Sequence, residues 1–230
     1  MSLRYEVKLV VDGADRDRVR ADLLLLPTAL RTIHPTRIVQ SIYLDTHDGR
    51  AVDENLAGVG ERTKLRFRWY GDAIVAAPGT LECKRRRDSL GGKDLLTIGA
   101  PMPLAGALGD EFVGALRAAL PTTERARLDG HRPTQWIRYR REYLGDVSGA
   151  LRITIDDRIT AYDQRGVARL QAVRATPLPD LCIVEAKADL ADRERIEDWL
   201  QAIGFRPSRC SKYVMACLPS EAPQPSRWGA

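Results

Sequence analysis

The residues of this chain best suited to chemistry are basic residues that alternate with apolar ones along short segments. In the segment 64–68, Lys64, Arg66 and Arg68 alternate with Leu65 and Phe67. Successive side chains of a β-strand point to opposite faces, so the three basic side chains share one face of a strand. Such a face suits phosphate oxygens, because arginine offers a planar set of donors and lysine a point charge.

The same alternation recurs in other segments, and their polar faces carry more positive than negative charge. The basic residues are Lys8, Lys64, Arg66, Arg68, Lys84, Arg86, Arg141, Arg152 and Lys187, and the acidic ones are Glu6, Glu82, Asp156 and Glu185. A single strand of this kind is more often an ordinary half-buried strand with its polar face toward water. Several strands with the same excess favour an enclosed cationic face, since buried cations without partners need a bound anion.

Glu185 is a candidate metal ligand, although a salt-bridge role is an equally good interpretation. Mg²⁺ and Mn²⁺ prefer oxygen ligands and commonly bridge a carboxylate to substrate phosphates. Phosphoryl transfer depends mainly on positioning and charge neutralisation and needs no protein nucleophile. The sequence shows no Ser-His-Asp or Cys-His arrangement, no Gly-rich phosphate loop and no C-x-x-C pair.

The elements that position these residues are mostly strands. We predict strands over 4–11, 38–44, 64–70, 80–86, 136–144, 151–159 and 181–188, helices over 15–26, 104–120 and 192–203, and a strand or helix over 211–218. No repeat or shift in composition divides the chain, so we expect one domain over 1–218 and a disordered Pro-rich tail over 219–230. Many strands with few helices predict a mainly antiparallel α+β fold whose sheet closes on itself.

Composition narrows the class of partner. The formal net charge of +5 and the pI of about 9.2 favour anionic ligands without identifying one. No segment approaches the roughly 20 apolar residues of a membrane span, and the first residues lack an apolar signal-peptide core, so we expect a cytoplasmic protein without direct membrane insertion. A nucleic-acid ligand is disfavoured, because the aromatic residues are scattered and no known binding module is present.

Eight short sequences add a resemblance that covers nearly the whole chain, from residue 4 to about residue 215. They are RYEVK at 4–8, SIYLDT at 41–46, KLRFR at 64–68, LECKRR at 81–86, YRREY at 139–143, LRITID at 151–156, IVEAK at 183–187 and SKY at 211–213. In this order they resemble the VTC domain, the polyphosphate polymerase domain of the vacuolar transporter chaperone and a member of the triphosphate tunnel metalloenzymes. The resemblance implies a closed tunnel β-barrel lined with lysine and arginine and flanked by a few helices.

The resemblance also implies the site residues. Catalytic roles fall to Arg66, Arg68, Lys84, Arg152 and Glu185, substrate binding to Lys8, Lys93, Tyr139, Arg141, Arg209, Ser211 and Lys212, and binding of Mn²⁺ or Mg²⁺ to Glu185. Hydrolytic and cyclase relatives begin with E-x-E-x-K, whereas here Arg4 replaces the first glutamate and leaves Glu6 and Lys8. The missing carboxylate favours the polymerase subgroup.

We therefore expect an enzyme that transfers the terminal phosphoryl group of ATP to a growing polyphosphate chain. Its ligands would be ATP and inorganic polyphosphate. The resemblance covers neither a phosphate-sensing domain nor a membrane anchor, so coupling to transport would need a separate membrane protein as partner. Two alternatives remain open: a tripolyphosphate or polyphosphate hydrolase of the same fold, and a polyphosphate-binding module without turnover.

Overall fold

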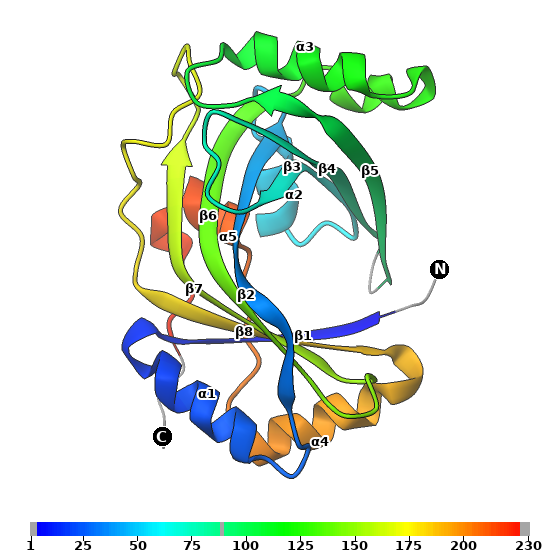
Figure 1. Cartoon of the computed structure of the whole chain (residues 1–230), viewed down its shortest axis with the longest axis vertical. Coiled ribbons are helices and arrows are strands. Elements are labelled where there is room, and N and C mark those ends of the chain that lie inside the picture. Colours follow the sequence, from blue (N-terminus) through cyan, green and yellow to red (C-terminus); the bar gives the residue numbers. More distant parts are fainter. Residues whose placement is uncertain (1–3, 88–89, 226–230) are drawn as a thin grey trace.

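One strongly curved antiparallel sheet forms the centre of the fold in the computed structural model, which describes residues 4–87 and 90–225 (Figure 1). The sheet has eight strands in the order β1-β8-β7-β6-β2-β3-β4-β5. Their bounds are β1 (Arg4–Asp12), β2 (Arg31–Asp45), β3 (Glu61–Tyr70), β4 (Ala76–Arg87), β5 (Leu90–Pro103), β6 (Arg132–Gly145), β7 (Arg152–Asp163) and β8 (Leu181–Asp189). All neighbouring strands are antiparallel.

The helices lie on both sides of this sheet. They are α1 (Arg16–Leu25), α2 (Arg50–Leu56), α3 (Gly109–Ala119), α4 (Arg193–Ile203) and α5 (Lys212–Cys217), with short 3₁₀ turns η1 (Gly13–Asp15), η2 (Thr122–Leu128), η3 (Leu190–Asp192) and η4 (Pro219–Glu221). Figure 1 shows α3 over one end of the outer side, α1 and α4 over the other, and α5 inside the curve. Within the described residues, no helix combines the length and the apolar character that crossing a lipid bilayer requires.

The predicted closed tunnel β-barrel is wrong, because the two edge strands do not pair. β1 and β5 stand at opposite ends of the strand order, and no backbone ladder joins them among the described residues. Figure 1 shows them running in different directions. The free edge of β1 is used in part by the chain before α5, since Ser208 N donates to Lys8 O over 2.8 Å. A closed barrel of eight strands has an interior just wide enough for side chains, whereas this sheet curves around a helix.

Two elements were not predicted, and one strand is longer than expected. Gly91-Gly92 indicates a turn in the sequence, yet these residues belong to β5, and α2 was also missed. β2 begins well before residue 38 because Pro35 falls in a register shift between His34 and Arg37, and a bulge is one of the places where a sheet tolerates proline. The ambiguous segment 211–218 contains a helix, α5. Of the predicted tail, residues 226–230 lie outside the described residues.

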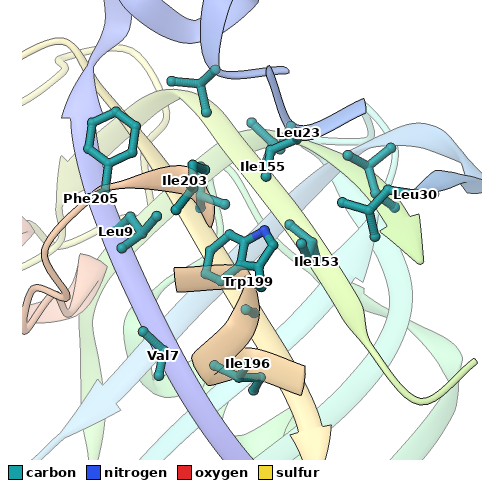
Figure 2. Close-up of a cluster of buried hydrophobic side chains, with 14 of the residues drawn as sticks. Val7, Leu9, Leu23, Leu30, Ile153, Ile155, Ile196, Trp199, Ile203 and Phe205 are labelled. Carbon is teal, nitrogen blue, oxygen red and sulfur yellow. The ribbon is translucent and has the colours of Figure 1, made fainter. Parts of the chain in front are cut away.

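Two apolar clusters cover the outer face of the sheet. In the first, shown in Figure 2, Trp199 of α4 is fully buried against Ile153 and Ile155 of β7. In the second, Phe112 of α3 packs edge-on against Phe67 of β3, with ring centroids 5.9 Å apart. Each fully buried side chain of this size stabilises the fold by about 1.5–3 kcal/mol, so the outer face holds the curved sheet together.

A third packing region lies inside the curve and fixes the position of α5. The ring of Tyr213 stacks on Tyr43 of β2 with centroids 4.7 Å apart, and its hydroxyl donates to Asp45 over 2.7 Å. Met215 packs against Val10 and Ile183. α5 therefore fills one part of the inner side and leaves the other part to polar side chains.

Candidate anion-binding site on the inner face

The inner face of the sheet is the face that carries Lys8, Ser41, Arg66, Glu82 and Glu185. Residues directly opposite each other in neighbouring strands share a face, and the register places Lys8 opposite Glu185 and Arg66 opposite Glu82. Curvature brings distant strands together on this face. Glu6 Oε2 on β1 lies 3.7 Å from Lys84 Nζ on β4, so one ion pair spans the two sides of the open sheet.

A row of three lysines crosses the inner face on neighbouring strands. Lys64 of β3 stands opposite Lys84 of β4, which stands opposite Lys93 of β5. Lys84 reaches Glu6, and Lys93 Nζ lies 3.1 Å from Glu82 Oε1. Like charges directly opposite each other destabilise a sheet, so this lysine row is costly unless an anion binds it.

Lys64 is the least compensated member of the lysine row. Its ammonium group donates to Ser211 Oγ over 2.9 Å, and no ion pair to it occurs among the described residues. Burial, together with the neighbouring charges of Lys8 and Lys84, lowers the pKa of Lys64 to about 7. A bound anion would remove this conflict.

Two arginines of β3 share one carboxylate. Arg66 Nε donates to Glu82 over 2.7 Å and its Nη1 to Tyr43 over 2.8 Å. Arg68, only 6% exposed, donates to Tyr139 over 3.1 Å and lies 3.5 Å from Glu82. Burial alone would raise the pKa of Glu82, but Arg66 and Arg68 outweigh it and lower that pKa to about 2. The pair leaves a net positive charge around one ionised glutamate.

Glu185 lies among three cations. Its carboxylate is 3.0 Å from Lys187, 3.6 Å from Lys8 and 3.9 Å from Arg141. Burial opposes its charge, but Lys187 and Lys8 hold the pKa of Glu185 well below its ordinary value. Burial likewise opposes the charge of Lys8, and Glu185 and Glu6 outweigh it to raise the pKa of Lys8.

The donor set around Glu185 limits the kind of metal site that fits here. Among the described residues, no group of three or more His, Cys, Asp or Glu side chains forms a metal cage. Mg²⁺ is usually held by one or two carboxylates together with substrate phosphates and water. Glu185 therefore fits a cation shared with a bound phosphate, and does not fit one held by the protein alone.

A buried carboxylate on β7 links the sheet to α5. Asp156 is fully buried and accepts from Arg141 over 2.5 and 2.6 Å and from Lys212 over 2.6 Å. Both cations also lie over the ring of Tyr139, at 5.3 Å for Arg141 and 4.9 Å for Lys212. Asp156 thus holds two of the residues expected to bind substrate.

Two of the expected site residues, Arg152 and Arg209, lie away from the centre of the inner face. Arg152 is exposed at the start of β7 opposite Lys187, so it lies at the rim of the inner face. Arg209 is exposed on the segment between α4 and α5. Neither makes an ion pair among the described residues. The side chains of Arg4 and Arg86 lie outside them.

Several residues of the inner face were not among the expected site residues. Lys64 and Lys187 were placed on the charged faces by alternation but given no role, and the hydroxyl of Tyr43 was missed. The signal for Tyr43 is its spacing, because it alternates with Ile42 and Leu44 of the outer face.

Comparison with known proteins agrees with this geometry. The profile of the VTC domain matches residues 3–101 and 116–219. No curated protein matches the sequence. A putative adenylyl cyclase from Hippeastrum, described as having a dominant triphosphatase activity, has a similar structure with 18% identity and a TM-score of 0.52, covering 96% of this chain and 100% of that one.

A second solved structure has the same fold. A putative adenylate cyclase from Vibrio parahaemolyticus is 12% identical with a TM-score of 0.50, covering 92% of this chain and 98% of that one. These likenesses extend over almost all of both chains and concern the fold. The profile match itself covers most of the sequence, as the resemblance predicted, and the chain belongs to the VTC domain family.

Proposed function

We propose that this protein is a polyphosphate polymerase that transfers the terminal phosphoryl group of ATP to the end of a polyphosphate chain on the inner face. The observation that carries the proposal is the lysine row, which gathers three cations from separate strands around too few carboxylates. Linear phosphates offer the repeated negative charge that such a row lacks. Membership of the VTC domain family supports the same substrate class.

The residues of the inner face have distinct parts in the proposed reaction. Arg66 and Arg68 would donate to oxygens of the transferred phosphoryl group, where negative charge must be offset in the transition state. The lysine row would hold the neighbouring phosphates. Glu185 would bind Mn²⁺ or Mg²⁺ together with the substrate, and the cation would supply further charge neutralisation.

The transfer balances without a protein nucleophile. A terminal oxygen of the acceptor chain forms a bond to the γ-phosphorus of ATP, the bond from that phosphorus to the β–γ bridging oxygen breaks, and ADP leaves with the electron pair. Tyr43 and Tyr139 hold Arg66 and Arg68 in place through hydrogen bonds of 2.8 and 3.1 Å. Positioning of this kind supplies most of the catalysis in phosphoryl transfer.

A synthesis assay tests the proposal directly. Purified protein with ATP and Mn²⁺, with and without a short polyphosphate primer, should form ADP and chains that resolve on a gel. Arg66→Gln should reduce synthesis at least about a hundredfold, the usual scale for losing a transition-state donor. Arg117→Gln is the control, because Arg117 lies on the outer helix α3 and pairs with Asp129. Absence of chain formation by the unaltered protein would contradict the proposal.

Hydrolysis of tripolyphosphate or polyphosphate is the second candidate. It is favoured by the triphosphatase activity described for the similar Hippeastrum structure. Release of phosphate from tripolyphosphate, without chain growth from ATP, would select it. Binding without either activity, unchanged by Glu185→Gln, would instead select a polyphosphate-binding module.

The ligands of the proposed reaction are ATP and inorganic polyphosphate. Because the proposed donor is ATP, we propose that the reaction takes place in the cytoplasm. Transport of the product across a membrane would require a separate membrane protein, which co-purification with the intact chain would detect.

A further inference from the structure

Arg37 of β2 lies at one end of the inner face and close to two aromatic rings. Its guanidinium carbon is 4.7 Å from the ring centroid of Tyr70 and 5.0 Å from that of Tyr143. His34 packs against Tyr143, with ring centroids 5.2 Å apart. Nothing in the proposed reaction uses these side chains.

Arg37 also lacks a counter-charge. The register places it directly opposite Arg141 of β6, and like charges in this position repel. Arg141 is neutralised by Asp156, whereas no ion pair to Arg37 occurs among the described residues. Its Nε is buried and has no hydrogen-bond partner among them. The positive charge of Arg37 is therefore not neutralised by a carboxylate of the described residues, and Arg141 opposite adds a second positive charge.

The two tyrosines distinguish Arg37 from an ordinary surface arginine, whose side chain would be free to move. Two rings this close to the guanidinium carbon restrict its movement and leave N–H groups for hydrogen bonds. Tyr143 is 9% exposed and Tyr70 is 50% exposed, so the group lies at the border between interior and solvent. A fixed planar donor at such a border is suited to one more phosphate of an extended ligand.

Arg37 and the lysine row lie toward opposite ends of the inner face. Leu44 of β2 pairs with Leu65 of β3. Lys64 is the neighbour of Leu65 in β3, so it lies near Asp45 at the far end of β2. The eight-residue step from Arg37 to Asp45 corresponds to about 26 Å along a strand. Arg68 and Tyr139 lie between the two ends, are 6% and 3% exposed, and are joined by a hydrogen bond of 3.1 Å.

We propose that Arg37 binds a distal phosphate of a linear polyphosphate that extends beyond the phosphates held at the lysine row. The inference rests on the proposed function and adds a property to it: the protein distinguishes a long chain from a triphosphate. A triphosphate held at the lysine row is too short to reach Arg37, whereas a long chain contacts both ends.

Two probes and a matched control test the inference. Isothermal titration would measure the affinity of Arg37→Gln for sodium tripolyphosphate and for long-chain polyphosphate. We expect about tenfold weaker binding of the long chain, the scale of one lost charge-assisted hydrogen bond, and less than about a twofold change for tripolyphosphate. The control Arg138→Gln removes the same charge from β6, where Arg138 pairs with the exposed Asp72, and should change neither affinity.

The outcomes separate this inference from the proposed function. Equal losses in Arg37→Gln and Arg138→Gln, or equal losses for both probes, would overturn the distal contact and leave the proposed function standing. Failure of the unaltered protein to bind either probe would overturn both. If Arg37→Gln is unstable, Arg37→Lys provides the same test: it keeps a charge but loses the planar fork, and should weaken only long-chain binding, by about two- to threefold.

Discussion

Strands β7 and β8 present two faces that are stabilised in different ways. On the outer face, Ile153, Ile155 and Val184 are buried with Trp199 in one apolar cluster. On the inner face of the same strands, Asp156 and Glu185 are equally buried but surrounded by cations. The outer face gains free energy from burial alone. The inner face depends on pairing and, for the lysine row, on a ligand.

This difference indicates that the charged side chains of the inner face serve binding and not stability. Apolar residues of similar volume often replace buried ion pairs at no cost or with a gain in stability. Lys84 and Lys93 are 49% and 43% exposed, but like charges directly opposite each other still destabilise a sheet, so folding alone does not explain the lysine row. The following changes test whether the two faces respond as differently as this comparison requires.

The largest effect on stability is expected on the outer face. Trp199→Ala would leave a cavity in the first apolar cluster and lower the free energy of unfolding by about 3–5 kcal/mol, measured by urea denaturation. Val147→Ala, at a side chain 68% exposed, should change it by less than about 0.5 kcal/mol. A loss below about 1 kcal/mol for Trp199→Ala would refute the role given to this cluster.

A comparable loss is expected when a buried charge loses its partner. Asp156→Asn would leave Arg141 and Lys212 without a carboxylate and lower the free energy of unfolding by about 3 kcal/mol. Added tripolyphosphate should stabilise Asp156→Asn by more than it stabilises Trp199→Ala, because the two unpaired cations of Asp156→Asn bind the anion more tightly.

The matched control is Asp163→Asn, which breaks an ion pair to Arg165 whose side chains are 39% and 42% exposed. Exposed pairs contribute less than about 1 kcal/mol. Equal losses at Asp156 and Asp163 would show that the inner carboxylate is not specially placed.

Lys64→Met should have opposite effects on folding and binding. Removing an ammonium group that no carboxylate offsets should raise the free energy of unfolding without ligand. The same change should weaken tripolyphosphate binding by about tenfold. Denaturation and titration calorimetry on one preparation measure both. A variant that is less stable and binds normally would contradict the comparison.

The smallest expected effect is a pH trend from the same residue. The pKa of Lys64 is lowered to about 7 from 10.5, so between these values the unfolded chain binds more protons there than the folded chain. The free energy of unfolding should therefore rise with pH across this window. Anion affinity should fall over the same window, because the phosphate favours the protonated amine.

Titrations from about pH 6 to about pH 9 would measure the trend in affinity, and denaturation the trend in stability. Lys64→Met should flatten both. Identical pH slopes in the variant and the unaltered protein would assign the trend to other groups.

The composition of the inner face could be predicted from the sequence because alternation is local. Lys64, Arg66 and Arg68 share a face in any strand, and the register then fixes what lies opposite. The family could be predicted because short sequences from separate strands occur in the right order. Each of these signals lies within a few residues of the chain.

Features that depend on distant parts of the chain could not be predicted. Whether β1 and β5 meet depends on how far the whole sheet curves around α5, and no local pattern records that. β5 was missed because Gly91-Gly92 is typical of a turn. The position of Arg37 was missed because the predicted strand began at residue 38, whereas β2 extends back through the register shift to Arg31.

The unpaired edges also bear on how copies of this protein behave toward one another. A free strand edge presents N–H and C=O groups that can pair with another molecule, and native sheets protect such edges with charges and prolines. β5 carries Lys93 and Asp94 in one half and Pro101 and Pro103 in the other, and prolines offer no N–H for pairing. The open sheet thus carries its own protection against edge-to-edge aggregation.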